Sequence, residues 1–182
     1  ADIVNITDDP MREGVSIQTN FDAEGVAAYR KSVVEGGVLK TLLHNRETAA
    51  NQGVESTGNA SKGSYASPVA ISPYAFCLEA GDKTEEELLA LAGNGIYITE
   101  LKGLHAGANA VTGDFSIESA GFEVKDGKIG AAVKSFTVAG NFFDLIKNIE
   151  ALSSNVKFGF PAGFTVFGAP NTLIRNCSVA GT

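Results

Sequence analysis

The chain has 182 residues, 44% hydrophobic and 19% charged, which is enough to bury a core as one domain or two small ones. Its formal net charge of −7 argues against a nucleic-acid backbone as the main partner. No apolar run approaches the length of a membrane span, and there are only two cysteines, so we expect a cytoplasmic protein without a membrane partner.

The first fifty residues predict a strand, a hairpin and a helix. The strand ends at Pro10, because proline cannot donate to a ladder. Gly36 and Gly37 join two β-favouring runs and so predict a hairpin. Asn45 is a suitable N-cap for a helix, and Gly53 is a suitable left-handed residue at its end. These elements are expected at residues 3–9, 29–34, 38–43 and 45–52.

A polar segment without hydrophobic periodicity follows at residues 56–67. Its composition leaves two readings open, a flexible linker or a loop that contacts a substrate or partner. Residues 68–78 favour a strand that Pro73 interrupts, which predicts an edge or bulged strand. Thr84 and the glutamates after it form a capping box that opens a short helix, and Gly93 ends this helix.

The middle of the chain predicts a second hairpin beside a glycine-rich loop. A strand over residues 96–101 leads into a loop of small residues at 103–113, and a second strand covers 114–124. An Asp-Gly pair at 126–127 between apolar runs is a strong hairpin signal, because both turn residues need φ > 0. The apolar residues of the second strand change parity along it, so we expect a bulge near Gly121.

The last third predicts a strand over residues 129–139 and then a helix over 141–151, with an asparagine as its N-cap. Three short strands are expected at 156–158, 164–167 and 173–179. The sum is about ten strands and three helices without an alternating βαβ rhythm. We therefore predict an α+β fold with a dominant, mostly antiparallel sheet that is curled or barrel-like.

The residues that could carry chemistry do not form a recognisable catalytic set. His44, His105, Cys77 and Cys177 are far apart in sequence, so no zinc spacing is present, and one disulfide between the cysteines stays open. No Gly-x-Ser-x-Gly elbow occurs. His105 is the only histidine placed in a loop where a general base could sit.

Many short segments nonetheless resemble, in order, the C-terminal part of the TldD/PmbA family, once described as modulators of DNA gyrase. They include FDAEGVAAYRKSVVEGG, STGNA, GIYITEL, VTGDFSIESAGFEVKDGKI and the closing CSVAGT. The resemblance is closer to the PmbA (TldE) branch than to the TldD branch. It implies that residues 1–182 form a single C-terminal domain of a longer protein whose N-terminal half is absent here.

The family's activity is zinc-dependent proteolysis of peptides and unfolded segments, including peptide maturation. The TldD branch carries a His-Glu-x-x-x-His helix upstream and a cysteine ligand near the C-terminus. The corresponding residues 157–162, KFGFPA, contain no cysteine, and Cys177 lies outside that motif.

The resemblance therefore implies a non-catalytic subunit with no zinc of its own. It would pair with a TldD-like catalytic subunit that holds zinc, or with itself as a homodimer. Two alternatives stay open. One is the C-terminal domain of a catalytic zinc peptidase whose ligands lie upstream, with Cys177 or another group completing the site. The other is a peptide-binding module without protease activity.

Two glycine-containing loops, residues 56–60 and 111–115, belong to the segments that resemble the family best. Glycine permits close approach of another backbone, and small polar side chains supply hydrogen bonds without bulk. We expect an extended peptide or a partner to bind there by strand addition, although the same residue types also close ordinary turns. The candidate contacts are Thr57, Gly58, Asn59, Thr112, Gly113 and Asp114.

Overall fold

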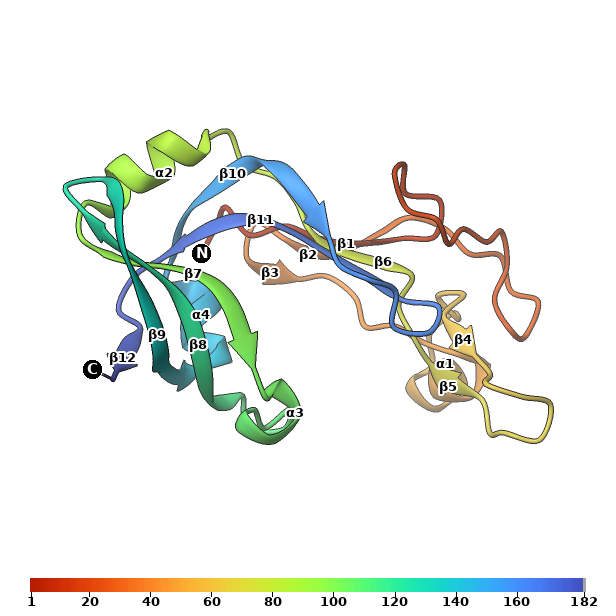
Figure 1. Cartoon of the computed structure of the whole chain (residues 1–182). Coiled ribbons are helices and arrows are strands. Elements are labelled where there is room, and N and C mark those ends of the chain that lie inside the picture. The colour runs from red at the N-terminus through yellow and green to blue at the C-terminus, as the bar shows by residue number, and fades with distance from the viewer. Residues whose placement is uncertain (182) are drawn as a thin grey trace. The chain divides into compact units, whose positions relative to one another are not determined.

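The computed structural model describes residues 1–181, so Thr182, the last residue of the CSVAGT segment, lies outside the described residues (Figure 1). The fold is α+β, with about 45% strand and 14% helix, as expected. The elements in chain order are β1 (Ile6–Asp9), β2 (Lys31–Glu35), β3 (Val38–Leu39), α1 (Arg46–Gln52), β4 (Ala60–Ser61), β5 (Ala70–Ile71), β6 (Ala75–Leu78), α2 (Glu85–Ala92), β7 (Gly95–Lys102), α3 (Leu104–Gly107), β8 (Asp114–Lys125), β9 (Lys128–Asn141), α4 (Phe142–Lys147), β10 (Ile149–Phe158), β11 (Val166–Ile174) and β12 (Ser178–Ala180).

The strands form three sheets, with orders β10-β11-β6-β1-β2-β3, β12-β9-β8-β7 and β4-β5. Most pairs are antiparallel, but β11 runs parallel to β6, so the sheets are mixed, and they are not closed into a barrel. Contacts divide the chain into two compact units. We call residues 2–80 and 156–170 the first unit. Residue 1, residues 81–155 and the residues from 171 onward form the second unit.

The local signals of the first unit are confirmed. Gly36 and Gly37, with φ of 57° and 73°, turn β2 into β3. Asn45 caps α1 through a reciprocal capping box with Thr48, and Gly53 ends the helix with φ of 67°. The core of this unit is formed by Val15, Ala75, Cys77 and Val166, with Ile17 packed against them.

Two predictions for the first unit are corrected. Residues 68–78 are not one interrupted edge strand, because Pro73 separates β5 from β6 and each belongs to a different sheet. β6 is an interior strand between β11 and β1. Since Pro73 lies outside it, all four residues of β6 keep an N–H for the ladder. The polar segment 56–67 is likewise not a loop throughout, because it contains β4.

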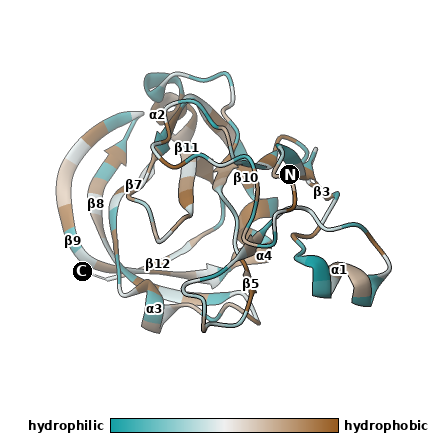
Figure 2. Cartoon of the chain, turned by 90° about the vertical axis from the view of Figure 1, so that its right-hand side faces the viewer, coloured by the Kyte–Doolittle hydropathy of each residue, from teal (hydrophilic) through white to brown (hydrophobic). Residues whose placement is uncertain are grey.

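The second unit confirms the α2 capping box and the long hairpin. Thr84 caps α2 reciprocally with Glu87. Asp126 and Gly127 both have positive φ, 49° and 73°, and connect β8 to β9. The register of β8 shifts around Gly121 against both neighbours, as the change of parity predicts. Figure 2 shows brown residues interspersed with teal ones along β8 and β9, as expected for strands with one buried face.

The helix predicted over residues 141–151 is too long. Asn141 does cap α4, but the helix ends at Lys147, and β10 begins at Ile149. The N–H of Asn148 closes the last turn by donating to the carbonyls at 144 and 145. Ile149, which has helical spacing with Phe142, Leu145 and Ile146 of α4, is the first residue of β10. Since β10 neighbours β11 in the sheet, tertiary pairing overrides the local pattern there.

Three further boundaries differ from the predictions. The loop over residues 103–113 contains the short helix α3. The three expected final strands are instead the end of β10, then β11 and then β12. None of the helices in residues 1–181 is long and apolar enough to cross a membrane.

Candidate functional site

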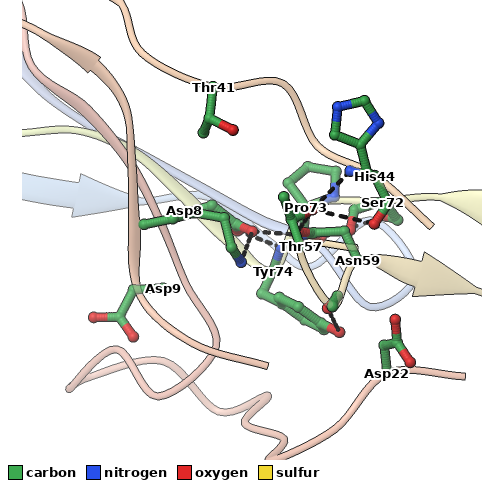
Figure 3. A network of polar contacts seen from close by, with 12 residues as sticks. Asp8, Asp9, Asp22, Thr41, His44, Thr57, Asn59, Ser72, Pro73 and Tyr74 are labelled. Carbon is green, nitrogen blue, oxygen red and sulfur yellow. Dashed lines mark hydrogen bonds and ion pairs between the residues drawn. The ribbon is translucent and has the colours of Figure 1, made fainter. Parts of the chain in front are cut away.

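The first predicted contact loop, residues 57–59, is part of a buried polar network in the first unit (Figure 3). Asn59 is fully buried, and its Nδ2 donates to Asp8 Oδ2 at 2.7 Å and to the Ser72 carbonyl at 3.1 Å. Its Oδ1 accepts from Thr57 Oγ1 at 2.8 Å. The hydroxyl of Thr57 also accepts from the His44 N–H at 2.6 Å. The side-chain amide of Asn59 is therefore occupied on both ends within the protein.

Asp8 is the centre of this network. Its Oδ1 accepts from the Tyr74 N–H at 2.6 Å, and its Oδ2 lies 3.3 Å from Lys31 Nζ, with both side chains almost completely buried. Lys31 Nζ also lies 4.7 Å from the ring centroid of Tyr29. Burial lowers the pKa of Lys31, and the neighbouring carboxylate of Asp8 opposes that shift. The ion pair of Asp8 and Lys31 thus links β1 to β2, and the Tyr74 N–H donates to the same carboxylate.

Tyr74 connects the network to the backbone of the loop. Its hydroxyl donates to the Gly58 carbonyl at 2.7 Å. Burial, together with the negative charges of Asp22 and Asp8, raises the pKa of Tyr74 to about 12. Asp22 Oδ2 in turn accepts from the Ala60 N–H at 3.0 Å.

Gly58 has φ of 68°, and a Cβ at this position would lie 2.4 Å from the Ala27 carbonyl oxygen. The backbone that approaches Gly58 closely is therefore that of Ala27 in the same chain, and not that of a bound peptide or partner. The role of residues 57–59 as peptide or partner contacts stays a prediction. Their positions give them a structural function that does not depend on any ligand.

The second predicted loop lies in the second unit and is held by Asn141. Asn141 Nδ2 donates to the Thr112 carbonyl and to Asp114 Oδ1, both at 2.9 Å. The hydrogen bond from Asn141 to the Asp114 carboxylate, followed by an interaction with the Thr112 side chain, holds the pKa of Asp114 below its ordinary value. Gly113 has φ of 80°, and a Cβ there would lie 3.0 Å from the ring of Phe143. Both Thr112 and Asp114 are exposed.

The candidate metal ligands are dispersed. Within the described residues, no group of three His, Cys, Asp or Glu side chains could hold a metal ion. Cys77 and Cys177 are free thiols in different units, and burial raises the pKa of both, which disfavours the thiolate that zinc binds. His105 is exposed on α3, whereas His44 is buried with its Nδ1 3.2 Å from Thr48 Oγ1. The donor set of residues 1–181 does not fit a zinc site.

A second ionic cluster in the first unit has Glu79 as its acceptor. Arg12 binds Glu79 in a bidentate manner, with Nη1–Oε1 and Nη2–Oε2 distances of 2.7 and 3.0 Å. Thr7 Oγ1 donates to the same carboxylate at 2.5 Å. The Arg12 hydrogen bonds, followed by that of Thr7, lower the pKa of Glu79 to about 2, although partial burial opposes the shift. Sequence reasoning missed this cluster, because its members are far apart in the chain.

The depressed pKa predicts a loss of stability in acid. The stability that Glu79 contributes is complete above its unfolded pKa of about 4.5 and is lost as pH falls through the folded pKa of about 2. Allowing for solvent screening, we expect its contribution to be about 1–2 kcal/mol. Urea unfolding at pH 7 and pH 3 should therefore show a smaller pH effect in Glu79→Gln than in the parent. An equal pH effect in both proteins would contradict this assignment.

Residues 1–181 match the family model described as the PmbA/TldA metallopeptidase C-terminal domain. The chain belongs to the PmbA/TldD metallopeptidase family. It is 35% identical to a metalloprotease of Methanothermobacter thermautotrophicus over 98% of this chain and 40% of that relative. It is 34% identical to the metalloprotease PmbA of Escherichia coli O157:H7 over 76% of this chain and 28% of that relative.

Solved structures of the PmbA/TldD family show the same fold. A Thermotoga maritima protein described as a candidate modulator of a DNA gyrase aligns with a TM-score of 0.86 and 41% identity, over 98% of this chain and 39% of that one. TldE from Thermococcus kodakarensis aligns with a TM-score of 0.89, covering 100% of this chain and 40% of that one, and its 23% identity shows the fold alone. The chain thus spans about two fifths or less of the length of these relatives.

Residues 157–162, where the resemblance leads us to expect the position of a cysteine ligand in the TldD branch, lie at the end of β10 and in the loop after it. These residues, 157–162, are exposed, and Phe160 is 98% exposed. Their side chains are those of lysine, phenylalanine, proline and alanine, none of which is a usual zinc ligand.

Proposed function

We propose that this chain is the C-terminal part of a PmbA/TldE-type subunit in a heterodimeric metallopeptidase. The complex would act in the cytoplasm on peptides and unfolded segments, including precursors that mature by proteolysis. In this proposal the TldD-like partner holds the zinc and performs the cleavage. The subunit that contains this chain would bind the partner and the peptide substrate, and it would supply no catalytic residue.

One observation carries the non-catalytic assignment. The exposed segment at residues 157–162 has no cysteine, and within the described residues no three His, Cys, Asp or Glu side chains are grouped so that they could hold a metal ion. A structural or catalytic zinc needs at least three protein ligands in a fixed geometry. Membership of a metallopeptidase family therefore supports the activity of the complex, and the donor set supports placing the metal in the partner.

Reconstitution tests this proposal. The full-length protein that contains this chain is purified alone, a TldD-type protein is purified alone, and each is assayed with an unfolded peptide before and after mixing. We expect cleavage only in the mixture, with activity rising to a plateau at a 1:1 ratio. Zinc-dependent cleavage by the protein that contains this chain, in the absence of the TldD-type protein, would contradict the proposal.

A further inference from the structure

The sequence contains a single Asn-Gly pair, Asn94-Gly95, and the structure places it at an exposed junction in the second unit. α2 ends at Ala92 and β7 begins at Gly95, so Asn94 lies in the bend between a helix and an edge strand. Asparagine is a chemically labile residue. The backbone nitrogen of the next residue can attack its side-chain amide, and glycine favours this attack because it has no Cβ and adopts many backbone conformations.

The side chain of Asn94 is held at one end and free at the other. Its Oδ1 accepts from the Asp126 N–H at 3.1 Å. This hydrogen bond draws electron density from Cγ, which is the atom that a nucleophile attacks. Within residues 1–181, the Nδ2 of Asn94 has no hydrogen-bond partner. The amide carbonyl is therefore polarised, while the nitrogen that would leave is unrestrained.

The surroundings of Gly95 differ from those of Gly127, the glycine of the neighbouring Asp-Gly turn. A Cβ on Gly95 would meet nothing within 4 Å, so space is open there. A Cβ on Gly127 would lie 3.0 Å from Ala90 Cα. The Gly127 N–H also donates to the Gly93 carbonyl at 2.8 Å, which holds this nitrogen in place. The structure thus restrains the Asp-Gly pair and leaves room at the Asn-Gly pair.

We propose that Asn94 is a self-modifying site that converts to aspartate and isoaspartate through a succinimide. The Gly95 nitrogen gives its proton to hydroxide and forms a bond to Asn94 Cγ. The Cγ–Nδ2 bond breaks, and Nδ2 leaves as ammonia after taking a proton from water. Water then opens the ring, at Cγ to give aspartate or at the main-chain carbonyl to give isoaspartate. Nothing is oxidised or reduced, and the only co-reactant is water.

The two products have different effects on the second unit. An aspartate at position 94 can still accept from the Asp126 N–H, and the new negative charge strengthens that hydrogen bond. An isoaspartate continues the chain through Cγ, which adds one atom to the backbone directly before Gly95. Because Gly95 pairs with Val124, we expect this product to open the first pairs of β7 with β8. The reaction needs no enzyme, so the loosened edge strand accumulates with the age of the molecule.

The test follows the full-length protein that contains this chain during incubation at pH 6 and at pH 8. Peptide mapping by mass spectrometry measures the conversion of Asn94, and synthetic standards separate aspartate from isoaspartate. A synthetic peptide of residues 89–99 gives the rate without the fold. We expect Asn94 in the folded protein to convert no more than tenfold slower than in the peptide, and faster at pH 8 because base removes the Gly95 proton.

An internal control and a variant test the assignment. Asn109 is also exposed, and its Oδ1 accepts from the N–H groups of Val111 and Thr112, but alanine follows it, so it should stay unmodified. Gly95→Ala should slow the conversion of Asn94 at least tenfold. This variant should fold as the parent does, since the added Cβ meets no other atom.

The Asn94→Asp variant separates the effect of charge from that of the longer backbone. We expect hydrogen exchange at residues 95–98 to match the parent in this variant and to be at least tenfold faster in the isoaspartate fraction of aged protein. Protection of Asn94 by the fold beyond a tenfold slowing, equal conversion of Asn94 and Asn109, or unchanged conversion in Gly95→Ala would each overturn the proposal. Parent-like exchange in the isoaspartate fraction would overturn the predicted opening of β7.

Discussion

Replacing Asp8 with leucine should destabilise the first unit by about 3–5 kcal/mol, because it leaves the buried ammonium of Lys31 without its counter-ion. The Asn59 amide and the Tyr74 N–H lose an acceptor in the same substitution. A loss of this size is a large fraction of the roughly 5–15 kcal/mol by which domains are stable. Urea unfolding followed by circular dichroism measures it.

Asp82→Ala is the control for this substitution. Asp82 also pairs with a lysine, Lys83, but its side chain is 83% exposed, so we expect a change within about 0.5 kcal/mol. The double variant Asp8→Leu/Lys31→Met should recover part of the loss, because it removes both buried charges. If Asp8→Leu cost no more than Asp82→Ala, the network would not hold the fold together in the way described.

Gly58→Ala should destabilise the protein by about 2–5 kcal/mol, which combines the cost of positive φ with the cost of forcing two backbones apart. Gly25→Ala separates the two effects. Gly25 has a similar φ of 73°, but a Cβ there would meet nothing within 4 Å. We therefore expect Gly25→Ala to cost only about 1–2 kcal/mol.

Thermal and urea unfolding of both glycine variants give this comparison. Equal losses in Gly58→Ala and Gly25→Ala would mean that the Ala27 backbone can move away, and that the close approach does not constrain the loop. A larger loss in Gly58→Ala would show that the STGNA segment is held by contacts within the protein, whatever else it binds.

The parts of the fold that the sequence predicted are those with causes close together in the chain. The caps at Asn45 and Thr84 depend on residues three positions away, and the turn at residues 126–127 depends on two adjacent residues with positive φ. The bulge near Gly121 follows from a change of parity within one strand. Each of these signals is complete within a short window.

The parts that the sequence did not predict depend on distant partners. The helical pattern predicted over residues 141–151 ends at Lys147, and the residues from Ile149 onward form β10, which neighbours β11 in the sheet. The polar network joins Asp8 to Asn59 across 51 positions, and no motif links the two. Lys31 is buried, which a charged side chain tolerates only with a partner, but the sequence of β2, KSVVE, does not mark it out from the neighbouring polar residues.

The zinc count is the most direct test of the central claim that this chain belongs to a non-catalytic subunit. The protein that contains it is purified alone and as a complex with a TldD-type partner, dialysed, and analysed for metal. We predict no stoichiometric zinc in the protein alone and one zinc per heterodimer in the complex. One tightly bound zinc per molecule of the protein alone would contradict the account.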